Sequence, residues 1–305
     1  MRALITGIAG FAGSHLADLL LASGSYEVAG IVRRATELTN IAAEKSRLSL
    51  IEADLADEDA VRRAIAAFEP ERIYHLAAQA SVAASWTQPA DTLQTNCLCQ
   101  LNVLRAAIDL APNARVLVVG SADEYGRVAP EELPLTEDSP LRPASPYALS
   151  KVTQDLMGRM YSYSHGLYVV RVRPFNHIGP RQRTGFVVPD FCRQIALIEA
   201  GYQPPVIRVG NLAAKRDFCD VRDVARAYWL ALERGERAAV YNICSGASVA
   251  VQDMLGVLLS LATLAITVET DPARLRPSDM PELVGSADLF AAVTGWRPEI
   301  PLSQS

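Results

Sequence analysis

Short runs rich in β-branched residues alternate with longer stretches of helical periodicity through the first half of this chain. The helical stretches lie near 12–23, 57–68, 90–110 and 146–164. The expected strands are ALIT (3–6), YEVAGIV (26–32), LSLIEA (48–53), RIYHLAA (72–78), RVLVVG (115–120) and LYVVRVR (167–173). Repeated strand–helix units of this length predict an α/β protein with a Rossmann-like, doubly wound parallel sheet and helices on both faces.

The second half is less regular and richer in proline. A predicted helix near 221–234 and a predicted strand, VYNI (240–243), return to the sheet. We therefore expect a dinucleotide-binding domain formed by 1–173 plus 221–245. The segments 174–220 and 246–305 are expected to form a smaller α/β substrate lobe beside the carboxyl ends of the strands.

Composition excludes several classes of function. Half of the 305 residues are apolar and the net charge is -5, which argues against a general nucleic-acid or membrane-surface binder. An anionic ligand must then be held by a few local arginines. The five cysteines, 97, 99, 192, 219 and 244, include no Cys-x-x-Cys pair, and four scattered histidines suggest no metal site.

The expected location is cytoplasmic. The N-terminus, MRALITGIAG, meets glycine too early for a signal peptide, and the apolar stretch 254–268 is too short to span a bilayer. We therefore expect a soluble protein with reduced thiols.

The sequence GIAGFAG joins the first strand to the first helix, with Gly7, Gly10 and Gly13 at spacings of three. Glycines permit a tight turn and let backbone N–H groups approach a pyrophosphate at a helix N-terminus. Such turns also occur for steric reasons alone, but this position between strand and helix favours a dinucleotide. Phe11 and Ala12 lie within the same loop and are expected to contact the cofactor.

Residues after the second and third strands bear on which cofactor is bound. Arg33 and Arg34 follow the second strand, where an arginine suits a ribose 2′-phosphate and favours NADP over NAD. A solvated basic turn is the alternative. Asp54, next to Leu55, has two interpretations: a hydrogen-bond acceptor for the adenine amine, or a cap of the helix that begins near Asp57.

The stretch SPYALSK (145–151) predicts a catalytic pair. Ser145 and Pro146 suit the start of a helix, so Tyr147 and Lys151 project from the same face. An ammonium favours the phenolate of a neighbouring tyrosine and lowers its pKa. Ser121 lies at the end of the fifth strand, where such sheets bind ligands. Tyr-x-x-x-Lys alone usually marks an exposed helix face, but this combination indicates acid–base chemistry on a substrate oxygen.

These features together resemble the extended short-chain dehydrogenase/reductase family over essentially the whole chain. The matching motifs are GIAGFAG, HLAAQ (75–79), GSADEYG (120–126), SPYALSK (145–151) and RPFNHIGP (173–180). The resemblance implies a catalytic Ser121, Tyr147 and Lys151, with the lysine also holding the nicotinamide ribose. It places Leu76, Ala77, Ala78 and Gln79 beside the cofactor, with NADPH preferred and NAD as the alternative.

The second half resembles the branch of this family that handles GDP-linked 4-keto-6-deoxymannose, as RPFNHIGPRQRTGFV, VGNLAAKRDFCDVRD and RLRPSDMP indicate. The resemblance implies the residues that contact the nucleotide: Asn176, Arg216 and Arg276 at the diphosphate, and Val187, Val188 and Asp279 at the guanosine. Guanidinium groups suit diphosphates. A surface ion pair, for example of Arg216 with Asp217 or Asp220, is the alternative for each arginine.

The expected activity is NAD(P)H-dependent reduction of the sugar 4-keto group. The alternatives are a 4,6-dehydratase or another nucleotide-sugar enzyme of the family, and a non-catalytic dinucleotide sensor. A dehydratase needs a further acid–base group, which relatives supply with a glutamate where this chain has the shorter Asp123. Glu124 is expected to face the other way on a strand-like segment. A homodimer through 90–110 and 146–164 is expected, with a bundle inside one subunit as the alternative.

Overall fold

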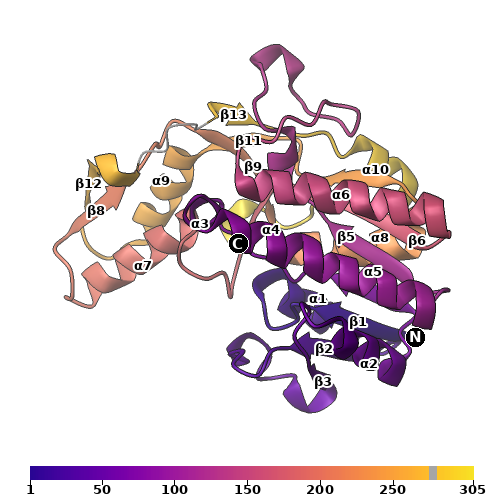
Figure 1. Cartoon of the computed structure of the whole chain (residues 1–305). Coiled ribbons are helices and arrows are strands. Elements are labelled where there is room, and N and C mark those ends of the chain that lie inside the picture. Colours follow the sequence, from indigo (N-terminus) through magenta and orange to yellow (C-terminus); the bar gives the residue numbers. More distant parts are fainter. Residues whose placement is uncertain (275–279) are drawn as a thin grey trace.

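The computed structural model describes residues 1–274 and 280–305. Its centre is a seven-stranded parallel sheet with the order β10-β6-β5-β4-β1-β2-β3 (Figure 1). These strands are β1 (Arg2–Thr6), β2 (Glu27–Val32), β3 (Ser49–Glu52), β4 (Arg72–His75), β5 (Arg115–Val119), β6 (Tyr168–Pro174) and β10 (Val240–Ile243). The doubly wound fold expected from the alternating pattern is confirmed.

Helices cover both faces of this sheet. The first face carries α1 (Phe11–Ala22), α8 (Val221–Arg234) and α10 (Asp288–Thr294). The second face carries α2 (Glu58–Phe68), α5 (Cys99–Leu110) and α6 (Pro146–His165). Successive residues of a strand point to opposite faces, so in β5 Leu117 packs with the first group while Val116 and Val118 pack with the second. Both faces are therefore buried, which explains the continuous apolar runs in the strands.

One predicted helix, at 90–110, is interrupted in the structure. The chain here forms α3 (Val82–Thr87), α4 (Pro89–Leu93), a π-helical turn (Gln94–Leu98) and then α5. The π turn places Asn96 in a buried position, where its Oδ1 accepts from the Gln79 N–H at 2.8 Å. The helix thus widens where its side chains secure the loop after β4.

The remaining strands form a second unit at one end of the molecule (Figure 1). The strand β9 pairs with three others, and a separate parallel pair lies beside α7 and α9. The strands are β7 (Asn176–Ile178), β8 (Val206–Val209), β9 (Lys215–Asp220), β11 (Ser248–Ala250), β12 (Thr267–Thr270) and β13 (Glu282–Leu283). The helices are α7 (Val187–Glu199) and α9 (Val251–Leu261).

Short 3₁₀ turns occur throughout the described residues. They are η1 (Thr39–Ile41), η2 (Lys45–Arg47), η4 (Ala122–Tyr125), η5 (Pro130–Glu132), η6 (Pro272–Arg274) and η7 (Leu302–Gln304). Of these, η4 matters for the site, because it directly follows Ser121.

The end of the chain packs differently from the rest of 246–305. Phe290 and Trp296 are fully buried in the core on the first face of the sheet. The indole Nε1–H of Trp296 also donates to the Asp223 carbonyl of α8 at 3.0 Å. Residues 288–296 thus pack against the large sheet, whereas we expected all of 246–305 in the smaller lobe. The division into two domains otherwise stays a prediction.

Among the described residues, no helix has the length and apolar character needed to cross a bilayer. The same residues contain no group of three or more His, Cys, Asp or Glu side chains arranged to hold a metal ion.

Candidate active site

The glycine loop between β1 and α1 is tightly folded. Gly7 has φ of +73°, and the Gly10 N–H donates to the Gly7 carbonyl at 2.9 Å. A Cβ on Gly13 would lie 2.2 Å from the Gly7 carbonyl oxygen, and one on Gly7 would lie 2.9 Å from the Ala77 nitrogen. Side chains are therefore excluded at both positions. The loop has the close-approach geometry and the helix N-terminus that a pyrophosphate needs.

The loop after β4 lies against the glycine loop. The Ala77 N–H donates to Thr6 Oγ1 at 3.2 Å, and the Gln79 side chain donates to Thr92 Oγ1 at 3.2 Å. Leu76 and Ala78 are partly exposed beside them. The structure thus brings both predicted cofactor segments to the carboxyl edge of β1 and β4, while their contact with a cofactor stays a prediction.

Phe11 joins the glycine loop to the second unit. Its ring stacks on His177 of β7 with centroids 5.6 Å apart and planes 9° apart. Ala12 follows it in the first turn of α1. The sequence alone did not reveal this contact.

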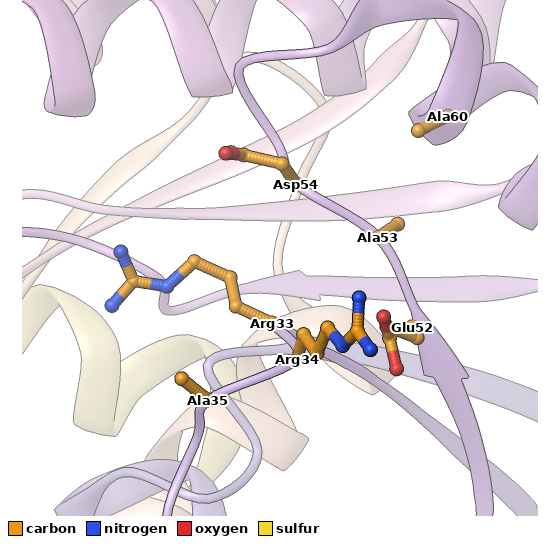
Figure 2. Close-up of a pocket in the computed structure, with 7 residues that line it drawn as sticks. All are labelled: Arg33, Arg34, Ala35, Glu52, Ala53, Asp54 and Ala60. Atoms are coloured by element: carbon orange, nitrogen blue, oxygen red, sulfur yellow. The ribbon is translucent and has the colours of Figure 1, made fainter.

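A cavity of about 410 Å³ lies beyond the ends of β2 and β3 (Figure 2). Its lining is Arg33, Arg34, Ala35, Glu52, Ala53, Asp54 and Ala60. Figure 2 shows that Arg34 points toward Glu52, whereas the guanidinium of Arg33 extends away from both. The two cations and the cavity fit a dinucleotide with a 2′-phosphate at this end.

Of the two interpretations of Asp54, the capping role is wrong. Asp57 is the N-cap of α2, and its Oδ1 accepts from the Ala60 N–H at 3.1 Å. Asp54 instead accepts from the Ala56 N–H at 2.9 Å and lines the cavity, with Leu55 buried next to it. Contact of Asp54 with the adenine stays a prediction.

The helix α6 begins where the sequence predicts. The Ser145 hydroxyl accepts from the Ala148 N–H at 3.1 Å, and Pro146 occupies the first helical position. Tyr147 is 8% exposed and Lys151 is 4% exposed. The pair is therefore buried, which excludes the solvated helix face as an explanation.

Three predicted catalytic side chains come together at the carboxyl end of β5. The Ser121 hydroxyl lies close enough to the Tyr147 phenol to lower its pKa. The ammonium of Lys151 donates to the Val119 carbonyl at 2.9 Å, and its Nζ lies 5.9 Å from the centroid of the Tyr147 ring. A substrate oxygen bound beside Ser121 and Tyr147 would have two hydroxyl groups within reach.

Burial shifts the two pKa values in opposite directions. Burial raises the pKa of Tyr147, the carboxylate of Asp123 raises it further, and the nearby Ser121 hydroxyl lowers it. Burial lowers the pKa of Lys151 to about 8, while Glu124 acts to raise it. The net lowering of the Tyr147 pKa that we expected from the ammonium is therefore wrong, because desolvation is the largest influence on this group and raises its pKa. Tyr147 therefore holds its proton more firmly in this structure than a phenol does in water.

The segment after Ser121 is a 3₁₀ turn, not the strand-like segment that we expected. Glu124 is fully buried, and its Oε1 accepts from the Ser121 N–H at 2.8 Å. Asp123 is only half-buried and lies near Tyr147. The two carboxylates do face different surroundings, but they do so as neighbours on a helical turn and not on a strand. Sequence analysis missed the role of Glu124, which depends on partners distant in the chain.

The expected substrate residues that the structure describes lie in the second unit. Asn176 begins β7, Val187 and Val188 begin α7, and Arg216 lies in β9. The Arg216 guanidinium donates to the Met280 carbonyl at 2.7 Å. Its proposed ion-pair partners have other contacts. The Asp217 carboxylate accepts from the N–H groups of Ser245 and Gly246, and Asp220 pairs with Arg222. Arg276 and Asp279 lie outside the described residues.

The sheet, the glycine loop and the Ser–Tyr–Lys group together define an NAD(P)-dependent oxidoreductase of the short-chain dehydrogenase/reductase type. Within that class the chain belongs to the GDP-mannose 4,6 dehydratase family, whose model matches residues 4–305. The resemblance stated from the motifs is thereby confirmed.

Two curated relatives are similar over nearly the whole chain. GDP-6-deoxy-D-mannose reductase of Pseudomonas aeruginosa is 34% identical over 304 residues, covering 100% of this chain and 94% of the relative. GDP-mannose 4,6 dehydratase 2 of Arabidopsis thaliana is 33% identical over 318 residues, covering 98% and 83%. Both expected activities thus occur among the relatives.

Solved structures agree with this assignment. RMD from Pseudomonas aeruginosa, complexed with NADPH, superposes with a TM-score of 0.86 at 32% identity and covers 100% of this chain and 95% of its own. UDP-glucose 4-epimerase of Thermus thermophilus, in complex with NAD, superposes with a TM-score of 0.87 at 32% identity, covering 100% and 96%.

Proposed function

We propose that this enzyme reduces the 4-keto group of GDP-4-keto-6-deoxy-D-mannose to give GDP-D-rhamnose, with NADPH as the hydride donor. The observation that carries this proposal is the buried Tyr147, which lies beside Ser121 and Lys151 at the carboxyl end of β5. The similarity to the Pseudomonas reductase supports it.

Ser121, Tyr147 and Lys151 would act on the 4-keto oxygen of the substrate. When bound, the cofactor supplies the hydride that adds to carbon 4. Ser121 donates a hydrogen bond to the oxygen as negative charge develops, and Tyr147 transfers its proton to it, so that the ketone becomes an alcohol. The Lys151 ammonium then stabilises the phenolate until a solvent proton replaces the one transferred. A positioned acid of this kind contributes roughly 10²–10⁴-fold to the rate.

The cofactor site favours NADPH. The residues fit a dinucleotide at two separate points. One is the glycine loop, where Gly7 and Gly13 leave no room for a Cβ, and the other is the cavity lined by Arg33 and Arg34. Two cations beside that cavity suit a 2′-phosphate, which NAD lacks. NAD stays the alternative cofactor, since a neighbour of this fold binds it.

The dehydratase is the second candidate, and one observation bears on it. A dehydratase must remove a proton from carbon 5 and expel water from carbon 6, which requires an acid–base group besides Tyr147. Asp123 lies near Tyr147, but its side chain is one methylene shorter than the glutamate that relatives carry. Active-site displacements of about 1 Å cost roughly a hundredfold in rate. Ketone reduction needs no such group, so Asp123 favours the reductase.

The deciding experiment offers each substrate separately. GDP-4-keto-6-deoxymannose with NADPH is expected to consume one equivalent of NADPH per alcohol formed. GDP-mannose with NADP and no reductant is expected to remain unchanged. Formation of the 4-keto-6-deoxy product from GDP-mannose at comparable turnover would replace the reductase by the dehydratase.

Arg216 is proposed to hold the diphosphate together with Asn176, while Val187 and Val188 contact the guanosine. Removing one charge-assisted contact of about 1.5–3 kcal/mol should raise KM about ten- to hundredfold in Arg216→Ala. Arg237→Ala, which removes an exposed arginine elsewhere, is the matched control and should leave KM unchanged. Equal KM values in the two variants would exclude Arg216 from the substrate site.

A further inference from the structure

A buried cluster of four charged side chains lies directly behind Ser121. Glu124 comes from η4, Asp155 from α6, and Arg171 and Arg173 from β6; each is at most 5% exposed. Arg173 Nε donates to Glu124 Oε2 at 3.1 Å and to Asp155 Oδ2 at 2.8 Å. Arg171 pairs with the other oxygen of Asp155. Arg173 therefore links the carboxylates of Glu124 and Asp155, which restricts rotation of the Glu124 side chain.

The second carboxylate oxygen of Glu124 contacts Ser121. Glu124 Oε1 accepts from the Ser121 N–H at 2.8 Å, and Ser121 Oγ accepts from the Asp123 N–H at 3.1 Å. These two bonds fix both the backbone and the hydroxyl of Ser121. A Cβ on Gly120 would lie 2.1 Å from Glu124 Oε1, so the carboxylate occupies space that only a glycine leaves open.

We propose that Glu124 is a positioning residue that fixes Ser121 beside Tyr147 and places its carboxylate behind Lys151, whose ammonium bonds to the Val119 carbonyl next to Gly120. The inference rests on the proposed function, since it concerns how the same site keeps its acid in the reactive state. Glu124 acts through Ser121 and Lys151 and need not touch the substrate.

The electrostatics of the cluster agree with this role. Burial and the neighbouring Asp155 raise the pKa of Glu124 to about 8, while Arg173 opposes the rise. Burial lowers the pKa of Lys151 to about 8, and Glu124 opposes that fall. Ionisation of Glu124 therefore holds the proton on Lys151.

Tyr147 responds in the same direction. The negative charges of Asp123 and Glu124 both raise the pKa of its phenol. Loss of the Glu124 charge should then lower the pKa of Tyr147 as well as that of Lys151. Both changes move the alkaline loss of reductase activity to lower pH.

Lysine NMR tests the charge coupling without any substrate. The chain has three lysines, Lys45, Lys151 and Lys215, so [¹³C]lysine labelling gives an easily assigned spectrum. In Glu124→Gln the titration midpoint of Lys151 is expected to fall by about one pH unit, because an opposite charge has been removed nearby. The exposed Lys45 and Lys215 serve as internal references and should not move. An unchanged Lys151 midpoint would overturn the inference, whether or not the reductase assignment holds.

Kinetics then separate charge from geometry. In Glu124→Gln the alkaline limb of the kcat profile should move to lower pH by the same amount as the Lys151 midpoint. Glu124→Asp keeps the charge but shortens the reach to Ser121, so kcat should fall about ten- to hundredfold with the Lys151 midpoint retained. If Glu124→Gln does not fold, full activity in Glu124→Asp would still overturn the positioning role.

Glu233→Gln is the matched control. Glu233 forms a comparable partly buried ion pair with Arg72, at 2.8 Å, but at the amino-terminal edge of the sheet. Its loss should lower stability without moving the Lys151 midpoint or the pH profile. If Glu233→Gln moves either of them as Glu124→Gln does, the effect is general destabilisation and the inference fails. A parent protein without reductase activity would instead refute the proposed function, while the NMR outcome would stand by itself.

Discussion

Tyr147 and Lys151 sit four residues apart on one helix, yet the surroundings of each matter more than the spacing between them. Burial disfavours the charged form of both groups, so the phenol holds its proton more firmly and the ammonium holds its proton less firmly than in water. A ketone reduction uses the protonated tyrosine first and the charged lysine afterwards. At the residue scale, the site thus depends on keeping Lys151 charged despite its burial.

Tyr147→Phe removes the proton donor while preserving the ring. We expect kcat to fall roughly 10²–10⁴-fold, with the NADPH dissociation constant unchanged. The matched control is Tyr163→Phe, on the same helix but 68% exposed, which should leave kcat unaltered. Steady-state assays and NADPH fluorescence titration measure the two quantities. Near-normal turnover in Tyr147→Phe would rule out its role as the acid.

Arg33→Ala removes one cation from the cavity beyond β2. One charge-assisted hydrogen bond of about 1.5–3 kcal/mol corresponds to a ten- to hundredfold preference for NADPH over NADH. We expect the variant to lose that preference through weaker NADPH binding, as the ratio of kcat/KM values would reveal. Arg63→Ala, an exposed arginine on α2, should keep the preference. Equal kcat/KM values for the two cofactors in the parent enzyme would contradict the assignment of Arg33.

Helix α6 begins at the active site, so its N-terminal cap has two effects. Ser145 satisfies the Ala148 N–H and sets the first turn, which carries Tyr147. A misplaced first turn would move the phenol relative to Ser121. At the element scale, the N-cap of α6 therefore affects both helix stability and catalytic geometry. The N-cap of α2 affects helix stability alone.

Ser145→Ala and Asp57→Ala test this coupling as a pair. Each removes one N-cap hydrogen bond and should lower the free energy of unfolding by about 1 kcal/mol. Only Ser145→Ala should also lower kcat, because α6 carries Tyr147 and Lys151 and α2 carries neither. Chemical denaturation and steady-state kinetics on both variants give the comparison. Similar kcat values for the two variants would show that the cap of α6 has no role in positioning Tyr147.

Two elements depart from what local pattern predicts. The stretch 90–110 contains a π turn, because Asn96 there bonds to Gln79 and to Ser150, both outside the helix itself. The turn at 122–125 is 3₁₀ and not extended, because Glu124 returns to the Ser121 N–H. In both cases a polar side chain with a distant or backward partner decides the local backbone.

An apolar surface on α3 and α6 bears on the whole molecule. Its exposed members are Trp86, Leu149, Leu156, Met160 and Tyr163. The inner faces of α5 and α6 already pack on the sheet, so these outward side chains are available to a second copy. The homodimer, expected from the sequence through 90–110 and 146–164, stays a prediction. We now place its contact on α6 and on α3, which precedes 90–110.

Leu156→Glu should break such a dimer by placing a charge in its apolar contact. We expect light scattering to give twice the 33.0 kDa chain mass for the parent and the chain mass itself for the variant. Leu261→Glu, at an exposed leucine of α9, is the control and should leave the mass unchanged. A parent of single-chain mass at micromolar concentration would exclude the dimer.

The sequence by itself determined the strands of the large sheet, the glycine loop and the start of α6, because each depends on residues within a few positions of one another. Gly13 beside Gly7, or Ser145 beside Ala148, needs no distant partner to be recognised.

The tertiary structure alone decided the rest. Glu124 meets Arg173, 49 residues away, and Trp296 meets Asp223, 73 residues away, so no local pattern reveals either contact. The protonation of Tyr147 and Lys151 also depends on burial by the assembled fold, since desolvation arises from everything that surrounds a group and not from its neighbours in the chain.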